Sequence, residues 1–279
     1  MNPAPARFGC CLNASTLRGT PVLRQIEVAA AAGFGAIELW FADTDAHLAA
    51  GGSLREIRQA LNDAGLAVPT LIYFAGWFKA SDGEWPEIRD ACQRRMEQAA
   101  ELGAGHLICS PPAGEADLPR GAGRYRELLD LGSRTGVVPI FEFLGFVEQY
   151  RSIESAIEVM SLAGGGCTVL DPFHVFRGGG SMESIARLNA DQIAISHFND
   201  TVPHPAREQQ TDADRVFPGD GTQDLRRYCD LLAGTGYSGW LSLELFRPDL
   251  WSRDPLSVAR EGFQKLQPFA QHSREPRRS

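Results

Sequence analysis

The chain has 279 residues and a mass of 30.4 kDa, which allows one large α/β domain or two smaller ones. Its net charge is −8, so we expect neither a nucleic-acid-binding face nor contact with an anionic membrane, because both require basic surfaces. The six cysteines form no CxxC pair, and no apolar run approaches the length of a membrane span. These features predict a cytoplasmic protein with reduced cysteines.

Strand-like and helix-like segments alternate along the whole chain. Short apolar runs typical of buried strands start near residues 8, 37, 69, 106, 139, 168, 193 and 240. Amphipathic segments lie between them, at residues 22–32, 54–64, 88–102, 125–133, 153–162 and 225–232. Eight such units predict a single (β/α)8 TIM barrel over residues 1–272, followed by a disordered tail at 273–279. A doubly wound sheet is the rival architecture, but it seldom needs eight repeats.

Four of the later apolar runs carry a polar side chain near their C-terminal end: Glu142, Asp171, His197 and Glu244. In a barrel these strands are neighbours and their C-terminal ends meet at one mouth. Taken alone, Glu142 could be a rim residue, Asp171 a turn cap before Pro172, His197 a core histidine and Glu244 a partner of Arg247. Their repetition at equivalent places favours a shared site. Three carboxylates and an imidazole without a thiolate predict one divalent metal ion, Mn²⁺ first, with Mg²⁺, Co²⁺ or Zn²⁺ as alternatives.

Three further residues are candidates for substrate contacts. His174 follows Asp171 by three residues and should stand over the same mouth, although a loop histidine is the alternative. Arg215 lies in a Pro-Gly turn that could aim its guanidinium at substrate oxygens, unless it forms only a surface ion pair with a nearby aspartate. Glu148 follows Glu142 by six residues, and a solvent-exposed loop carboxylate is an equally good interpretation.

Other polar and aromatic residues near the strand ends have supporting roles in this hypothesis. Asp200 could orient His197 or a ligand water. Glu38, Tyr73, Trp77 and Phe78 could line a wall of the site, but for them a place in the core is the better interpretation.

Five motifs together resemble the xylose-isomerase-like barrel superfamily, which includes sugar isomerases, epimerases and endonuclease IV relatives. The motifs are Phe141-Glu-Phe-Leu-Gly145, Leu170-Asp-Pro-Phe-His-Val175, Ser196-His-Phe-Asn-Asp200, Arg215-Val-Phe-Pro-Gly-Asp-Gly221 and Ser242-Leu-Glu-Leu-Phe-Arg-Pro248. Within the superfamily, the inosose isomerases are the most similar group. The resemblance implies that Glu142, Asp171, His197 and Glu244 bind the metal. It also implies that His174 and Arg215 meet the substrate, and Glu148 matches a substrate-contacting glutamate of the ketose 3-epimerases.

The expected activity is isomerisation or epimerisation of a keto-cyclitol or ketose by proton transfer through a metal-bound enediolate. Glu142 and Glu244 would move the proton, while His174 and Arg215 would hold substrate hydroxyls. A lyase that dehydrates a keto-sugar or keto-cyclitol on the same site is the main alternative. A non-catalytic sugar-binding barrel would not need all four ligands, and a DNA-repair endonuclease would need a basic face. The expected partner is a small polyhydroxy ketone, and both a monomer and a homo-oligomer remain open.

Overall fold

Eight parallel strands close into a barrel in the computed structural model, which describes residues 8–271. The strands are β1 (Gly9–Asn13), β2 (Ala36–Trp40), β3 (Thr70–Phe74), β4 (His106–Cys109), β5 (Val138–Glu142), β6 (Cys167–Leu170), β7 (Ile193–Phe198) and β10 (Trp240–Leu243). They follow the order β1-β10-β7-β6-β5-β4-β3-β2 around the barrel. This confirms the predicted (β/α)8 fold. The tail expected at residues 273–279 lies outside the described residues.

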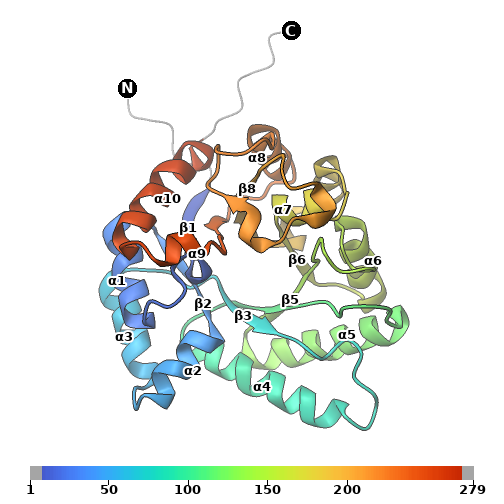
Figure 1. Cartoon of the computed structure of the whole chain (residues 1–279). Coiled ribbons are helices and arrows are strands. Elements are labelled where there is room, and N and C mark those ends of the chain that lie inside the picture. Colours follow the sequence, from blue (N-terminus) through green and yellow to red (C-terminus); the bar gives the residue numbers. More distant parts are fainter. Residues whose placement is uncertain (1–7, 272–279) are drawn as a thin grey trace.

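Helices surround the barrel as an outer ring (Figure 1). They are α1 (Val22–Ala32), α2 (Phe41–Ala49), α3 (Leu54–Ala64), α4 (Trp85–Glu101), α5 (Leu118–Thr135), α6 (Ile153–Ala163), α7 (Pro172–Arg177), α8 (Leu225–Gly234), α9 (Pro248–Trp251) and α10 (Pro255–Ala270). Helices α4 and α5 begin earlier than the apolar periodicity predicts, because a proline in the first turn of each favours helix initiation. No helix within residues 8–271 is long and apolar enough to cross a membrane.

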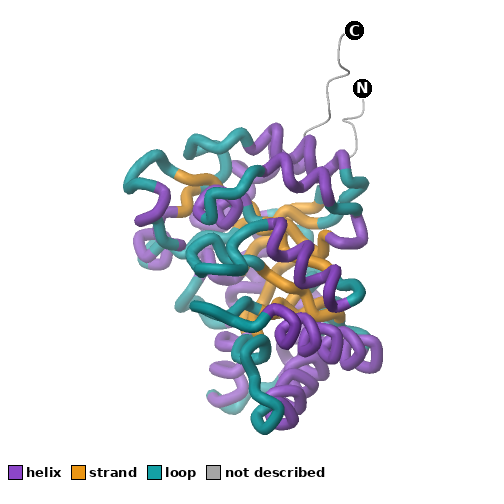
Figure 2. Tube along the Cα trace, turned by 90° about the vertical axis from the view of Figure 1, so that its right-hand side faces the viewer, coloured by secondary structure: helices purple, strands orange, loops and turns teal. Residues whose placement is uncertain are grey.

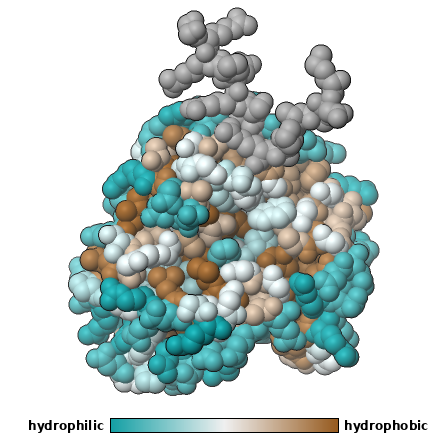
Figure 3. All heavy atoms as spheres, turned by 180° about the vertical axis from the view of Figure 1, so that it is seen from behind, coloured by the Kyte–Doolittle hydropathy of each residue, from teal (hydrophilic) through white to brown (hydrophobic). Residues whose placement is uncertain are grey.

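The hydrophobic core has two parts, because the strands are covered on both faces. A small cluster of Ile72, Ile108, Ile140, Cys167, Val169 and Ile195 fills the barrel itself. A larger cluster packs between the strands and the helices. Burial of each large aliphatic side chain contributes about 1.5–3 kcal/mol. Seen from behind, hydrophobic residues gather toward the middle of the face and hydrophilic ones around its edge (Figure 3), as expected when the helices turn their polar sides outward.

The long loops project on one side of the barrel (Figure 2). The loop after β7 contains a short antiparallel pair, β8 (Asp200–Thr201) and β9 (Arg215–Val216). The Asp200 carboxylate accepts hydrogen bonds from the backbone N–H groups of Gly219, Gly221 and Gln223 at 3.0–3.1 Å. It therefore fastens the far end of this loop to the end of β7, which holds Arg215 over the barrel mouth.

Candidate metal and substrate site

The four strand-end residues point into the barrel because side chains alternate along a strand. Glu142 lies two residues after the barrel-filling Ile140, so both face inward. Asp171 directly follows β6, His197 is the penultimate residue of β7, and Glu244 directly follows β10. Since β5, β6, β7 and β10 are consecutive in the barrel, the structure brings these side chains together.

The buried atoms of this cluster face one another across a short gap. His197 Nδ1 lies 3.4 Å from Glu142 Oε1 and 3.1 Å from Glu244 Oε2. One potential ligand atom from each of Asp171, His197 and Glu244 lies within 4.8 Å of the others. His197 Nδ1 is buried and has no hydrogen-bond partner. A buried nitrogen without a partner is uncommon, and a nitrogen lone pair surrounded by carboxylates fits a divalent cation.

The environment shifts the acid–base properties of these residues in different directions. Burial raises the pKa of Glu142 to about 7, which outweighs the lowering effect of His197. The pKa of Asp171 is lowered despite its burial, because the Arg215 guanidinium and two histidines lie close to it. Burial opposes a charge on His197, but Glu244 and Glu38 raise its pKa well above the usual value. The cluster therefore attracts positive charge at this nitrogen, whether a proton or a metal ion.

Arg215 lies inside the site, which excludes the alternative of a purely surface ion pair. Its side chain is only 1% exposed, and Nη1 donates to Asp171 Oδ2 at 2.6 Å and to Glu244 Oε2 at 2.5 Å. Nη2 donates to Asp212 Oδ1 at 2.8 Å. The carboxylates around His197 outnumber this one guanidinium, which leaves a surplus of negative charge that a divalent ion would reduce.

His174 lies on α7 rather than in a loop, because Asp171 caps this helix. The Asp171 side chain accepts from Phe173 N–H at 2.8 Å, and Pro172 occupies the first turn. Burial lowers the pKa of His174 to about 4, so the ring is neutral near pH 7. Its Nδ1 accepts from Gly145 N–H at 3.2 Å, which places the ring proton on Nε2, 3.1 Å from Arg215 Nη2. Two donors therefore lie side by side at the pocket.

Two buried residues connect the cluster to the first strands of the barrel, and the sequence did not predict their role. Asn13, at the end of β1, donates to Glu38 Oε2 and Glu244 Oε1 at 3.1 Å each. Glu38, on β2, is fully buried, and both of its oxygens lie 3.3 Å from His197 Nε2. Asp200 was expected near His197, but its carboxylate instead holds the loop after β7. The repetition of polar strand ends could have included both residues, since Asn13 ends β1 and Glu38 lies two residues before the end of β2.

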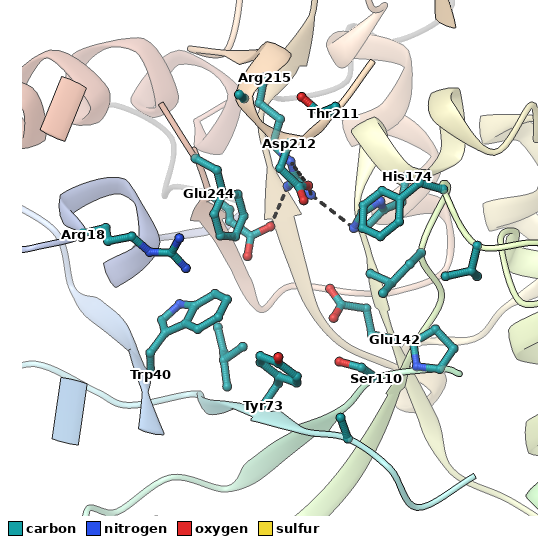
Figure 4. A pocket seen from close by; sticks show the side chains of 18 of the residues that line it. Arg18, Trp40, Tyr73, Ser110, Glu142, His174, Thr211, Asp212, Arg215 and Glu244 are labelled. Carbon is teal, nitrogen blue, oxygen red and sulfur yellow. Dashed lines mark hydrogen bonds and ion pairs between the residues drawn. The ribbon is translucent and has the colours of Figure 1, made fainter. Parts of the chain in front are cut away.

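A pocket of about 710 Å³ opens beside the cluster, which is ample for a sugar-sized ligand. Glu142, His174, Arg215 and Glu244 line it on the side of the cluster (Figure 4). Aromatic rings form much of the remaining wall: Trp40, Tyr73, Phe146, Phe246 and Trp251.

Several residues considered near the pocket have other places in the structure. Glu148 is not among the residues that line it; its carboxylate accepts from Gly114 N–H at 2.6 Å in an exposed loop. Trp77 and Phe78 belong to the core, as expected. For Tyr73 that expectation was wrong, because its side chain is exposed and lines the pocket.

A (β/α)8 barrel with this kind of polar cluster and pocket at its C-terminal strand ends is the architecture of enzymes that act on small molecules. The chain belongs to the xylose isomerase-like TIM barrel family, whose model matches residues 26–269. This confirms the superfamily resemblance seen in the sequence.

The curated relatives carry names of different activities, isomerases as well as dehydratases. An inosose isomerase from Bacillus velezensis is 26% identical over 267 residues, covering 90% of this chain and 94% of that protein. A 3-dehydroshikimate dehydratase from Pseudomonas putida is also 26% identical, over 259 residues, but these cover 90% of this chain and 40% of that longer protein. Among solved structures, an IolI protein with a bound zinc atom gives a TM-score of 0.85 at 22% identity, covering 94% of this chain and 98% of that one. At this identity the likeness shows the fold.

Proposed function

We propose that this protein is a divalent-metal-dependent isomerase or epimerase of a keto-cyclitol or ketose. The observation that carries the proposal is the pairing of a buried glutamate, Glu142, whose pKa is raised to about 7, with the partnerless Nδ1 of His197 beside it. Inosose isomerases among the curated relatives support the same class of reaction.

Glu142, Asp171, His197 and Glu244 would hold the cation through their oxygens and Nδ1. When bound there, a divalent ion supplies Lewis acidity that polarises a substrate carbonyl and stabilises negative charge on its oxygen. Mn²⁺ is the first candidate because the set is rich in oxygen, and Mg²⁺, Co²⁺ and Zn²⁺ remain alternatives.

Glu142 and Glu244 come from β5 and β10 and flank the same nitrogen, so they can approach a bound substrate from two sides. Glu142, with a pKa near neutrality, is suited to remove the proton α to the carbonyl. Glu244 is suited to return a proton to the neighbouring carbon or to the opposite face of the enediolate. The adjacent donors His174 Nε2 and Arg215 Nη2 would hold one substrate oxygen between them.

A lyase is the second candidate, and the 3-dehydroshikimate dehydratases among the relatives favour it. It would share proton removal by Glu142 and then expel a β-hydroxyl group as water. NMR of metal-loaded protein with a panel of keto-inositols and ketoses in D₂O separates the two. An isomerised or epimerised product with deuterium at the α carbon supports the isomerase, whereas an unsaturated product supports the lyase. Absence of both products across the panel, for protein with proven metal content, would contradict the proposal.

A further inference from the structure

We propose that Glu38 is a positioning residue that fixes the ring of His197 so that Nδ1, and not Nε2, is offered to the metal. The two residues are 159 positions apart in the chain and meet only because β2 and β7 close into one barrel. Both Glu38 oxygens lie 3.3 Å from His197 Nε2, on the side of the ring opposite to Glu142 and Glu244.

Glu38 is itself held rigidly, as a positioning group must be. It is fully buried, and three donors from three different strands converge on it: Asn13 of β1, Thr70 of β3 and Ser242 of β10. Because hydroxyls and an amide donate to its oxygens, the carboxylate can remain charged without contact with water. Glu38 is not among the residues that line the pocket, so we assign it no direct contact with the substrate.

The geometry determines the tautomer of the imidazole. A carboxylate can only accept, so Glu38 keeps a proton on Nε2. Nδ1, which lies between Glu142 and Glu244, is then the nitrogen whose lone pair a cation would take in place of a proton. Of the two ring nitrogens, Nδ1 is the one without a hydrogen-bond partner. A carboxylate behind a ligating histidine also increases the basicity of the ligating nitrogen, and removal of such partners typically costs about 10- to 100-fold in metal affinity.

The test is the metal affinity of Glu38→Gln in the full-length protein, measured for Mn²⁺ and Zn²⁺ by competition with a chromophoric chelator. The variant keeps the shape of the side chain and removes its charge. We expect about 10- to 100-fold weaker binding. The matched control is Thr168→Val on β6, which deletes another fully buried polar group whose hydroxyl contacts only the backbone of its own and the neighbouring strand. It should bind metal like the wild type even if its melting temperature falls.

Wild-type affinity in a folded Glu38→Gln protein, or an equal loss in Thr168→Val, would overturn the proposal. If Glu38→Gln fails to fold, a measurement on the wild type tests the proposal instead. In the zinc-loaded wild type, ¹⁵N NMR of the His197 ring should show a protonated Nε2 and a metal-bound Nδ1. A metal-bound Nε2 would contradict the assigned role of Glu38.

Arg18 lies on the wall of the pocket away from His174, and the inference drawn from it rests on the proposed function. Arg18 lines the pocket, and its guanidinium lies 5.3–5.8 Å from the ring centres of Trp40, Phe246 and Trp251. Figure 4 shows it facing the cavity across from Glu244. Among the described residues no acceptor or ion-pair partner engages it, although Asp43 is close enough to sense its charge.

We infer that Arg18 is an anchor for an anionic group, so that the substrate is a polyhydroxy ketone bearing a carboxylate or phosphate. The other guanidinium of the pocket, Arg215, is already neutralised by Asp171, Glu244 and Asp212. Three aromatic rings surround the Arg18 guanidinium, and its N–H donors have no acceptor among the described residues, so they remain available to an anionic group.

The test compares a polyhydroxy-cyclohexane carboxylate with its carboxamide by calorimetry on metal-loaded protein. We expect the wild type to bind the carboxylate at least about tenfold more tightly, as for a charged hydrogen bond, and Arg18→Gln to lose this preference while keeping its affinity for the amide. Arg94→Gln, which changes the net charge equally but does not line the pocket, should keep the preference. A wild type without preference, or a preference retained in Arg18→Gln, would overturn the inference. Turnover of neutral keto-cyclitols with no effect of Arg18 would leave the proposed function intact.

Discussion

Glu142 and Glu244 are chemically identical side chains that the fold places in unequal surroundings. Glu244 accepts hydrogen bonds from Asn13 and Arg215. Glu142 has only His197 beside it to offset the cost of burying its charge. A difference of this kind between two carboxylates commonly separates their roles in proton transfer.

Replacement of either glutamate by glutamine should reduce kcat by at least about 100-fold, the usual contribution of a general acid or base. Because loss of metal would give the same result, metal content is measured on the same samples. A metal-replete Glu244→Gln with full turnover would remove Glu244 from the proton-transfer role.

The raised pKa of Glu142 also makes the stability of the metal-free protein depend on pH. The folded state binds this proton with a pKa of about 7, against 4.5 for an ordinary glutamate. Its contribution is therefore fully present below pH 4.5 and is lost as pH rises through 7, at about 1.4 kcal/mol per unit. Glu142→Gln has no such titration, so its stability relative to the wild type should increase between pH 5 and 8. Urea unfolding of both metal-free proteins checks this, and parallel pH profiles would contradict it.

Arg215→Ala should retain the metal, because removal of a positive charge leaves Asp171 and Glu244 more negative. It should lower kcat/KM by about 10- to 150-fold, the value of one charged hydrogen bond to the substrate. Arg215→Lys should restore little of the lost kcat/KM, because an ammonium group cannot donate two parallel hydrogen bonds as a guanidinium does. Unchanged kcat/KM in metal-loaded Arg215→Ala would show that Arg215 does not contact the substrate and only neutralises the charges of Asp171 and Glu244.

At the scale of elements, the loop between β7 and α8 supplies residues of the site that do not come from the barrel strands, Arg215 among them. The β8–β9 pair fixes its beginning, and the Asp200 carboxylate fixes its end. Asp200→Ala leaves four backbone N–H groups without this acceptor, those of Thr201, Gly219, Gly221 and Gln223, each at a cost of about 1–3 kcal/mol if buried.

Asp200→Ala should therefore lower kcat/KM at least about tenfold, as expected for misplacement of a substrate-positioning group, while the metal is retained. Asp220→Ala in the same loop is the control, because Asp220 makes an exposed contact with Lys265 only and should matter little. Limited proteolysis should cleave the loop faster in Asp200→Ala alone. Equal cleavage rates in the two variants would show that Asp200 does not order the loop.

The barrel and the four strand-end residues could be predicted because apolar runs and their final polar side chains are local features of the sequence. The network around Glu38 could not, because its donors come from strands up to 204 residues away in the chain. In isolation Glu38 lies in an apolar strand and has the pattern of a core residue. The short helix α7 was also missed, because the capping role of Asp171 before Pro172 was considered only as an alternative to metal binding, whereas Asp171 does cap this helix.

At the scale of the whole molecule, the candidate metal site joins four of the eight barrel strands. Its residues extend from Glu142 to Glu244, and Asn13 continues the contacts to β1 at the point where the barrel closes against β10. Because its ligands come from four strands, a cation bound there would stabilise the closed barrel as a whole, and not a single strand or helix.

Saturating metal should accordingly raise the melting temperature. At a hundredfold excess over Kd the free energy of unfolding increases by about 2.7 kcal/mol, and each kcal/mol corresponds to roughly 2–4 °C for a large domain. His197→Ala should show no such increase in the same calorimetric scan. An unchanged wild-type melting temperature in excess Mn²⁺ and Zn²⁺ would contradict the metal site.

Two of the five tryptophans, Trp40 and Trp251, line the pocket, while Trp77 and Trp85 are buried in the core. Trp40 Nε1 donates to Asn13 at 2.8 Å, and Asn13 in turn contacts Glu244. A ligand that fills the pocket displaces solvent from both indoles, and a change at Glu244 reaches Trp40 through a single side chain. The protein thus contains its own fluorescent indicator of occupancy. Libraries of polyols and sugar acids can be screened by intrinsic emission before any assay of turnover exists.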